Sequence, residues 1–307
     1  MSTAAGTPAI EAEGLGKRYR RTWALRDCTL SVPGGRIAGL VGVNGAGKTT
    51  LLHLAAGLLT PSTGTARVLG RPPAANPSQL GRIGFVAQSA PLYTALSIAD
   101  HLHFGQAMNP HWDGEAARTR IDRLGLDTAQ RAGSLSGGQR AQVALTMAVA
   151  KRPDLLILDE PVASLDPLAR REFLQMLMEA VADHDMTVVL SSHLIADLER
   201  VCDHLVVLSA GRLRLAGDVD DLLAEHHLLT GPRRAVDQLP GDQEVVQASH
   251  TDRQTTLLVR TTGQIHDPRW SVAPVGLEDL VLAYMGSTPN DPTAAPSRPS
   301  HNIEVIR

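Results

Sequence analysis

The sequence predicts an α/β fold with a mostly parallel sheet at its centre. From Ile10 onward, short apolar runs alternate with stretches of helical spacing, which is the order of elements in such folds. The apolar runs are compact and continuous, as is typical of strands that are covered on both faces. Hydrophobic residues make up 43% of the chain, which is enough for a buried core and excludes general disorder.

The composition of the 307 residues limits the classes of function. Acidic residues exceed basic ones, for a formal net charge of −3, so no strong field exists to hold nucleic acid or an anionic membrane. The two cysteines cannot form a disulfide framework, and they lack the spacing of a zinc site. No apolar run approaches the ~18 residues of a membrane span. Residues 1–8 have no secretory signal pattern. We therefore expect a cytosolic, globular protein with a flexible leader at residues 1–8.

The order of the expected elements supports the fold class. The strands of the sheet are expected at five compact apolar runs, residues 37–41, 82–87, 155–158, 187–190 and 205–208. Three helices are expected between them, at residues 48–56, 138–150 and 167–182. The first of these helices ends before Gly57, a residue that commonly ends helices.

The chain is expected to divide into a main domain and a small appendage. Residues 96–131 show no strand pattern and predict a helical insert within the main domain. The pattern changes near residues 229–232, which read Leu-Thr-Gly-Pro. We therefore expect a main domain at residues 9–230 and an appendage at residues 231–285.

The appendage is expected to be a small α+β unit. Two alternating runs, at residues 244–249 and 255–260, predict a pair of strands, and residues 277–285 predict a closing helix. The strands could equally extend the main fold. Four prolines together with serines, threonines and small residues, in the segment from Gly286 onward, predict a disordered tail at residues 286–307. His226 and His227 are expected at a solvated helix end.

The most informative motif is the glycine-rich segment at residues 42–49. It reads Gly-Val-Asn-Gly-Ala-Gly-Lys-Thr and follows the pattern G-x-x-x-x-G-K-[ST]. Its glycines let the backbone curl so that N–H groups cradle phosphates, and the start of the next helix adds positive potential. Lys48 can reach the β- and γ-phosphates, and Thr49 can ligate Mg²⁺. The expected contacts to ATP come from Gly42, Asn44, Gly45, Ala46, Gly47, Lys48, Thr49 and Thr50.

The second motif is an apolar run that ends in two acids, Asp159 and Glu160. A carboxylate at the end of a strand beside the phosphate loop suits a residue that holds Mg²⁺, usually through water, and we assign this role to Asp159. Glu160 would lie beyond the strand, where it could orient or deprotonate an attacking water. A strand that ends in two acids is also common at protein surfaces, so this motif gains its meaning from the phosphate loop.

The third motif is Leu135-Ser136-Gly137-Gly138-Gln139, directly before a predicted helix. Its serine hydroxyl, flexible glycines and free N–H groups suit a second anion-binding helix start. An ordinary helix cap with a glycine turn would have the same residues, and the motif in isolation favours that interpretation.

The order and spacing of the three motifs resemble the nucleotide-binding subunits of ATP-binding-cassette (ABC) transporters. Leu-Ser-Gly-Gly-Gln is the signature of that family, and the resemblance covers roughly residues 10–229. It implies a P-loop ABC-type ATPase core with antiparallel N-terminal strands and a helical subdomain at about residues 89–152, and it implies ATP and Mg²⁺ as ligands.

The resemblance also implies roles for single residues. Tyr19 matches the aromatic residue that stacks on adenine. Gln88 matches the glutamine that senses Mg²⁺ and the attacking water, and it is a candidate metal contact together with Thr49 and Asp159. His193 matches the histidine that contacts the γ-phosphate. The loop of Ser164, Leu165 and Asp166 matches the segment that passes signals between two sites.

The resemblance further implies that two chains pack head to tail, so that the signature of one chain closes over the ATP of the other. Glu160, His193 and Gln88 are the expected catalytic residues of an ATPase. Because the chain carries both Glu160 and an unbroken signature, a homodimer could have two working sites. A heterodimer with a homologous ATPase subunit stays open.

The expected partner is a separate integral membrane permease, which places the chain at the inner face of the cell membrane. The helical insert, which includes Phe104 and Trp112, corresponds to the part of such subunits that receives a permease; core packing is the simpler explanation of the two aromatics. The short C-terminal appendage resembles those of bacterial exporters, so we expect export. The alternative is a soluble ABC ATPase that acts on ribosomes or nucleic acid. A single set of motifs, the lack of a heptad run and the lack of excess basic charge all disfavour it.

Overall fold

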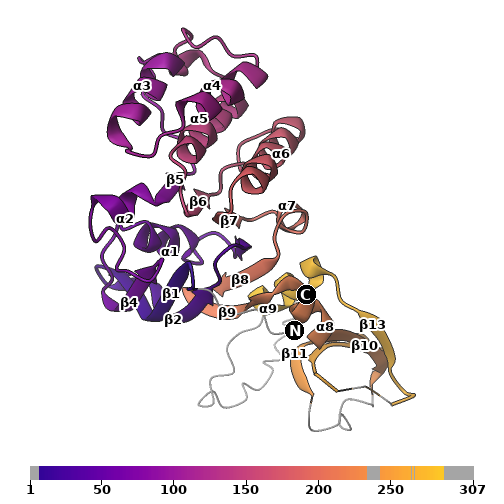
Figure 1. Ribbon diagram of the computed structural model, residues 1–307. Helices are drawn as coiled ribbons and strands as arrows, with labels where there is room; N and C mark the ends of the chain where they lie inside the picture. Colours follow the sequence, from indigo (N-terminus) through magenta and orange to yellow (C-terminus); the bar gives the residue numbers. More distant parts are fainter. Residues whose placement is uncertain (1–6, 234–242, 264, 266, 287–307) are drawn as a thin grey trace, which may run out of the picture.

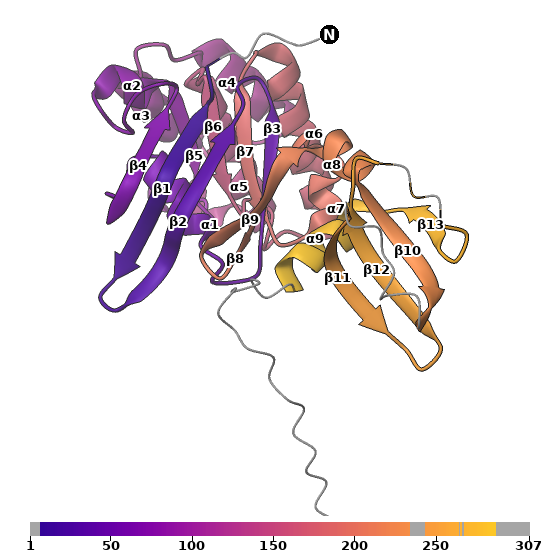
Figure 2. The same ribbon diagram turned by 90° about the horizontal axis from the view of Figure 1, so that it is seen from below.

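The computed structural model describes residues 7–233, 243–263, 265 and 267–286. The predicted flexible leader, apart from residues 7 and 8, and the predicted disordered tail, apart from Gly286, lie outside the described residues. The described strands form three sheets (Figures 1 and 2). None of the described helices is long and apolar enough to cross a membrane.

The central sheet has six strands in the order β5-β6-β7-β3-β8-β9. All neighbours pair in parallel except β8 and β9, which are antiparallel. The strands are β3 (Ile37–Val41), β5 (Ile83–Val86), β6 (Leu155–Asp159), β7 (Thr187–Ser192), β8 (His204–Ser209) and β9 (Arg212–Asp218). The five strands that the apolar runs predicted are therefore confirmed, and β9 is an edge strand that they did not predict.

Both faces of the central sheet are buried, which explains the continuous apolar runs. In β6, Leu155 and Ile157 belong to the core under α1 (Lys48–Ala55), whereas Leu156 and Leu158 belong to the core under α5 (Gly137–Ala150) and α6 (Pro167–Asp183). These three helices match the three that helical spacing predicted. The short helix α7 (Ile195–Leu198) follows β7 and packs against the same face as α6.

An antiparallel sheet of three strands covers the α1 side of the core, as the family resemblance implied. Its order is β2-β1-β4, with β1 (Ile10–Tyr19), β2 (Thr22–Val32) and β4 (Thr63–Val68). The short α2 (Pro77–Gly81) leads from this sheet into β5. Figure 2 shows the three strands lying beside α1 and the central sheet.

The helical subdomain has its own small core. It contains α3 (Ile98–Met108), α4 (Gly114–Arg123), the short 3₁₀ helix η1 (Ala132–Ser134) and α5, and it lies at the top of Figure 1. Its buried residues include Ile98, Ile121 and Val143. Trp112 packs against Gly105 of α3, where a Cβ would overlap the indole ring. Phe104, in contrast, is half exposed.

The C-terminal part contains the third sheet, which is antiparallel in the order β11-β12-β10-β13. The strands β11 (Glu244–His250) and β12 (Gln254–Arg260) match the expected pair, and β10 (His226–Pro232) and β13 (Ser271–Pro274) complete the sheet. The sheet follows α8 (Val219–Glu225) directly, and α9 (Leu277–Gly286) connects it to the central sheet. In Figure 2, α9 lies between the two parts.

Two local expectations for this part differ from the structure. His226 is the first residue of β10 and is fully buried, so it does not decorate a solvated helix end. Its Nδ1 lies 2.6 Å from the carbonyl oxygen of Leu222, and its Nε2 lies 2.9 Å from the hydroxyl oxygen of Tyr284. The strand also runs through the boundary that was expected at residue 231, because the turn signal Gly231-Pro232 ends β10 rather than preceding the sheet.

Candidate functional site

The phosphate-binding loop joins β3 to α1 and follows a path that only glycine allows at two points. Gly47 has a φ of 104°, and a Cβ there would lie 2.6 Å from the carbonyl oxygen of Ala24. A Cβ at Gly42 would overlap the carbonyl oxygen of Leu208 at the end of β8. Both contacts involve backbone that cannot move aside, so the loop can pass close to β2 and β8 only with glycine at these positions.

The loop surrounds a cavity of about 380 Å³. Seven residues of the loop and of the first turn of α1 line it, together with Ala24, Gln88 and Glu160: these seven are Asn44, Gly45, Ala46, Gly47, Lys48, Thr49 and Thr50. Lys48 is only 5% exposed, and its ammonium group donates a hydrogen bond of 2.7 Å to the carbonyl oxygen of Gly42. The lysine is thus anchored at the floor of the cavity, with the start of α1 beside it.

The two acids stand at the carboxyl end of β6, next to β7. Asp159 is 2% exposed, and its Oδ1 accepts a hydrogen bond of 2.9 Å from the hydroxyl of Ser191 on β7. The same hydroxyl accepts a bond of 2.8 Å from the backbone N–H of Glu160. Glu160 has a φ of 45°, a left-handed conformation that is unusual for a residue with a side chain. The chain therefore turns sharply after Asp159, with Ser191 bonded on both sides of the turn.

The carboxylate of Glu160 brings the three expected catalytic residues together. Its Oε2 lies 3.2 Å from Nδ1 of His193 and accepts a bond of 3.5 Å from the amide nitrogen of Gln88. Its Oε1 lies 3.1 Å from Nζ of Lys48. These residues come from the ends of β5, β6 and β7 and from the start of α1, so the edge of a parallel sheet assembles the cluster.

The donor atoms around the cavity fit the ligands that the motifs imply. A loop of backbone N–H groups, a buried ammonium group and a helix start form a cradle for an anionic polyphosphate. Thr49 and Glu160 line the cavity with oxygen atoms, which Mg²⁺ prefers as ligands. Asp159 is not part of the lining; it is buried next to Glu160 at the end of β6. Among the described residues, no cluster of three or more His, Cys, Asp or Glu side chains is placed to hold a metal ion.

The signature motif lies at the start of α5, away from the cavity lining. Ser136 caps the helix: its hydroxyl accepts a bond of 3.2 Å from the N–H of Gln139, and its own N–H donates to Oε1 of Gln139 over 2.9 Å. Leu135 is buried, and a Cβ at Gly138 would lie 3.0 Å from Cβ of Ala169. None of the described residues 135–139 lines the phosphate cavity of the same chain. The segment is therefore both a helix cap and an exposed helix start.

The other two expected site elements are also placed at the surface. Tyr19 ends β1 and is 46% exposed, with Nζ of Lys17 at 5.6 Å from the centre of its ring. Ser164 is exposed in the loop before α6, and Leu165 is buried. Asp166 caps α6 by accepting bonds of 3.0 Å from the N–H groups of Leu168 and Ala169. Neither Tyr19 nor this loop lines the phosphate cavity.

Our sequence analysis missed Ser191, although it links both acids. The available signal was a polar residue at the carboxyl end of a buried strand that neighbours β6. Such a position commonly carries function in α/β folds, but a serine there has many structural explanations.

The fold and the cluster define a phosphate-loop ATPase. The sequence pattern of the family described as ABC transporter matches residues 25–163. The nickel import ATP-binding protein NikO of Rhodobacter capsulatus is 35% identical over 244 residues, covering 74% of this chain and 96% of that protein. The phosphonates import ATP-binding protein PhnC 2 of Pseudomonas syringae pv. syringae is 34% identical, and the match covers 70% of this chain and 86% of that protein.

Solved structures agree with the sequence comparison. The structure of cbiO1 of Clostridium perfringens, described as part of the ABC transporter complex cbiONQ, matches this chain with a TM-score of 0.62 and 28% sequence identity. The match covers 72% of this chain and 92% of that chain. The chain belongs to the ATP-binding subunits of ABC transporters, and the family assignment and the ATPase activity that the motifs implied are confirmed. The expected export direction is not supported, because NikO and PhnC 2 are both named as import proteins.

Proposed function

We propose that two copies of the chain bind two molecules of ATP with Mg²⁺ and hydrolyse them to drive a separate membrane permease. The observation that carries the proposal is the position of the Glu160 carboxylate, which lies within 3.5 Å of groups on Lys48, Gln88 and His193 at the mouth of the phosphate cavity. A carboxylate in this place can polarise a water that attacks the terminal phosphate, while the lysine and the loop hold the phosphates.

Each residue of the cluster has a distinct part in this mechanism. Lys48 and the loop N–H groups neutralise charge on the phosphates, which is the main contribution that a protein makes to phosphoryl transfer. Glu160 orients the water and accepts its proton. His193 and Gln88 both contact the Glu160 carboxylate; His193 would also contact the γ-phosphate, and Gln88 would contact Mg²⁺ and the attacking water. Thr49 and, through water, Asp159 would hold Mg²⁺, which would supply positive charge beside the phosphates.

A second chain completes the site in this proposal. The exposed helix start at Ser136 offers a serine hydroxyl and N–H groups, yet it does not line the phosphate cavity of its own chain. Packed head to tail, the signature of one copy, residues 135–139, would cover the ATP of the other, and exposed Tyr19 would stack on adenine. Binding of ATP then selects the closed dimer, and hydrolysis releases it. The partner is a second copy or a homologous ATPase subunit.

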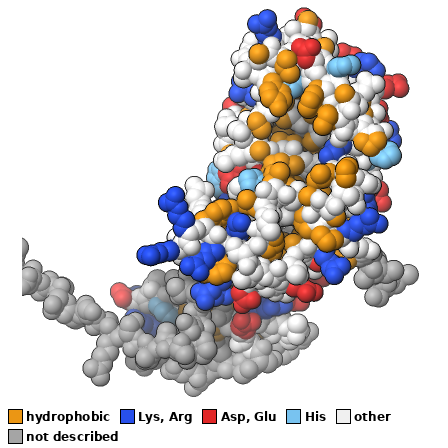
Figure 3. Space-filling view, turned by 90° about the vertical axis from the view of Figure 1, so that its left-hand side faces the viewer, with side chains coloured by type: hydrophobic (Ala, Val, Ile, Leu, Met, Phe, Trp, Pro, Cys, Tyr) orange, Lys and Arg blue, Asp and Glu red, His pale blue; other side chains and the backbone are white. Residues whose placement is uncertain are grey.

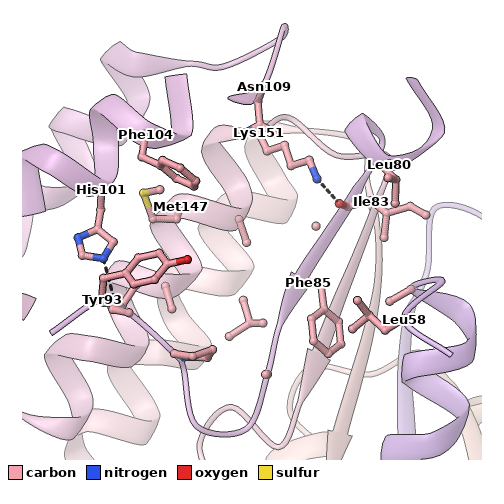
Figure 4. A pocket seen from close by; sticks show the side chains of 18 residues that line it. Leu58, Leu80, Ile83, Phe85, Tyr93, His101, Phe104, Asn109, Met147 and Lys151 are labelled. Carbon is pink, nitrogen blue, oxygen red and sulfur yellow. Dashed lines mark hydrogen bonds between the residues drawn. The ribbon is translucent and has the colours of Figure 1, made fainter. Parts of the chain in front are cut away.

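The permease would bind at an apolar groove between the helical subdomain and the central sheet. The groove has a volume of about 460 Å³, and Figure 4 shows Tyr93, Phe104 and Met147 on one side of it and Leu58, Leu80 and Phe85 on the other. Tyr93, Phe104 and Leu58 are each at least half exposed. Figure 3 shows apolar side chains gathered across this face. An apolar groove lined by exposed aromatic and aliphatic side chains suits a protein partner.

This partner would place the chain on the cytoplasmic side of the membrane. Because NikO and PhnC 2 are named for import, whereas the short appendage suggested export, the proposal includes no direction of transport.

The first experiment tests whether the chain binds a membrane permease. Tagged Glu160→Gln protein is incubated with ATP and Mg²⁺ and recovered from detergent-solubilised membranes of the host. We expect one polytopic membrane protein in comparable amounts, and the additional change Phe104→Asp should abolish its recovery. Leu282→Asp is the matched control, since Leu282 is 49% exposed but lies on α9, away from the groove. Recovery of ribosomes, DNA-bound proteins or nothing from the membrane would contradict the transport function.

A further inference from the structure

Arg170 connects two of the segments that the ATPase mechanism requires. It lies in the first turns of α6, directly after the loop 164–166. Its Nη2 donates a hydrogen bond of 3.3 Å back to the carbonyl oxygen of Leu165 in that loop. Its Nε lies 3.6 Å from Oδ2 of Asp197 on α7. One guanidinium group therefore contacts both the loop and the helix that follows His193.

The acidic partner is held in a buried position. Asp197 is 7% exposed and lies four residues after His193. A buried carboxylate is costly unless a cation compensates it. Burial raises the pKa of the Asp197 carboxyl and outweighs the opposing effects of the neighbouring Arg170, Arg200 and His193. The ion pair with Arg170 is the one that connects α7 to another helix.

The surroundings make α7 a short element held at both ends. It spans only Ile195–Leu198, and it packs against β7, which carries Ser191, and against α9. Ile195 and Leu198 are buried in the main core. Asp197 therefore lies on a short turn with a buried base, and the segment between this turn and β7 carries His193, whose Nδ1 lies 3.2 Å from Oε2 of Glu160.

The signature segment also has an arginine that bonds back to the preceding loop but, within the part of the chain that the structure describes, without an ion pair like that of Arg170 with Asp197. Arg140 of α5 donates from Nη2 to the carbonyl oxygen of Leu135 over 3.3 Å, just as Arg170 donates to that of Leu165. In both helices an arginine in the second turn holds the loop that precedes the helix. At α6 the guanidinium group also faces a buried carboxylate on a neighbouring element, and this contact extends its effect beyond its own loop.

We propose that Arg170 is a positioning residue that couples the loop 164–166 to His193, so that a change at the loop alters how His193 holds Glu160. The inference rests on the proposed two-site dimer, in which the loop 164–166 lies between the sites. The Arg170–Asp197 pair would then transmit a change at one ATP site to Glu160, the residue that activates water at the other site.

The test compares steady-state ATP hydrolysis of the full chain with that of Arg170→Met, Arg170→Lys, Asp197→Asn and the double variant Arg170→Met/Asp197→Asn. Arg171→Met is the matched control, because Arg171 is exposed on the same helix. Turnover, half-saturating ATP and the Hill coefficient are measured, together with the melting temperature and with ATP affinity by equilibrium binding.

We expect Arg170→Met and Asp197→Asn each to lower kcat by roughly tenfold, since small displacements of catalytic groups have effects of this size. The Hill coefficient should fall toward one, with ATP affinity unchanged. Arg170→Lys should recover part of the turnover, and the double variant should be no worse than either single variant, because both break one link.

Three results would overturn the inference. One is a variant that keeps the wild-type kcat and Hill coefficient. Another is an additive double variant. The third is loss of activity that only follows the melting temperature, with the Hill coefficient intact, since a structural role would give that result. If Arg170→Met does not fold, Asp197→Asn, which keeps the size of the side chain, gives the same readouts. A wild-type protein without ATPase activity or without a dimer would instead contradict the proposed function itself.

Discussion

The ammonium nitrogen of Lys48 lies 3.1 Å from Oε1 of Glu160, which joins the phosphate loop to the residue after β6. Both side chains are nearly buried, at 5% and 11% exposure, so their charges interact more strongly than an exposed pair would. The same ammonium group donates to the carbonyl oxygen of Gly42. A lysine held in this way presents a fixed positive charge to the cavity, and the carboxylate beside it is fixed by the same contact.

The change Glu160→Gln should separate binding from hydrolysis. The amide keeps the size of the side chain but cannot accept a proton from water, so we expect turnover to fall about 10²-fold or more, while ATP stays bound. Single-turnover hydrolysis and equilibrium ATP binding measure the two effects. Glu199→Gln, at an exposed position after α7, is the control. Full activity of Glu160→Gln would refute the assigned role.

The change Lys48→Ala should act on binding itself. It removes the buried ammonium group from the cavity, and a charged hydrogen bond contributes about 1.5–3 kcal/mol, so we expect ATP affinity to fall tenfold or more. Isothermal titration with ATP and Mg²⁺ measures this. Lys151→Ala is the matched control, since Lys151 donates to the carbonyl oxygen of Ile83 and lines the apolar groove instead. Equal affinities of the two variants would contradict the prediction.

The change Ser191→Ala tests a residue that belongs to none of the sequence motifs. Ser191 is fully buried, and its loss would leave both the Asp159 carboxylate and the Glu160 N–H without this partner, at a cost of about 1–3 kcal/mol in unfolding free energy. We expect lower turnover as well, because Glu160 would be less well placed. Thermal unfolding and ATPase rates are compared with those of the variant Ser209→Ala. Ser209 is a buried serine on β8 whose hydroxyl donates a hydrogen bond to the carbonyl oxygen of Met285. An active Ser191→Ala enzyme would show that the hydroxyl is not needed.

Local patterns predicted most of the fold because most elements bury apolar side chains with a clear period. The runs at β3, β5, β6, β7 and β8 are continuous because both sheet faces are covered, and helical spacing marks α6. His226 shows why the rest was not predictable. Its burial depends on Tyr284 of α9, and no local period reports a contact between segments so far apart in the chain.

The residues of the candidate site also divide into those that the sequence predicted and those that it did not. Lys48, Asp159 and Glu160 belong to motifs whose spacing indicates phosphate chemistry, so their positions at one sheet edge followed from the order of strands. The contacts of Ser191 and Arg170 depend on the exact approach of β6 to β7 and of α6 to α7. A single serine or arginine in a sequence has many roles, and only the packed structure distinguishes them.

The appendage should prove part of the main core rather than an independent unit. On α9, Leu280 is fully buried in the core that also holds Leu205 and Val207 of β8, whereas its neighbour Leu282 is 49% exposed. Leu280→Ala should lower the free energy of unfolding of the whole chain by about 2–5 kcal/mol. Leu282→Ala should change it by less than about 0.5 kcal/mol. Chemical denaturation measures both, and a Leu280→Ala protein as stable as the control would contradict the shared core.

The buried histidine should make folding depend on pH in a defined direction. Burial lowers the pKa of His226 below its ordinary value of 6.5, although the Leu222 carbonyl, Glu225 and Glu244 oppose this and Arg260 adds to it. His204 on β8 is also buried, and burial lowers its pKa as well. In each case the unfolded chain binds the proton more readily than the folded chain, so the contribution to stability is complete above pH 6.5 and is lost as the pH falls through the lowered pKa.

We therefore expect the free energy of unfolding to be smaller at pH 6.0 than at pH 7.5. The hydrogen bonds require the neutral ring with its proton on Nδ1, which donates to Leu222, while Nε2 accepts from Tyr284. In His226→Asn the chain should be less stable at pH 7.5, but the decrease toward pH 6.0 should be shallower than in the wild type, because one of the two histidines no longer titrates. Urea denaturation at the two pH values measures both. His103→Asn, which changes an exposed histidine of α3, should keep the wild-type slope, and an unchanged slope in His226→Asn would show that His226 does not titrate in this range.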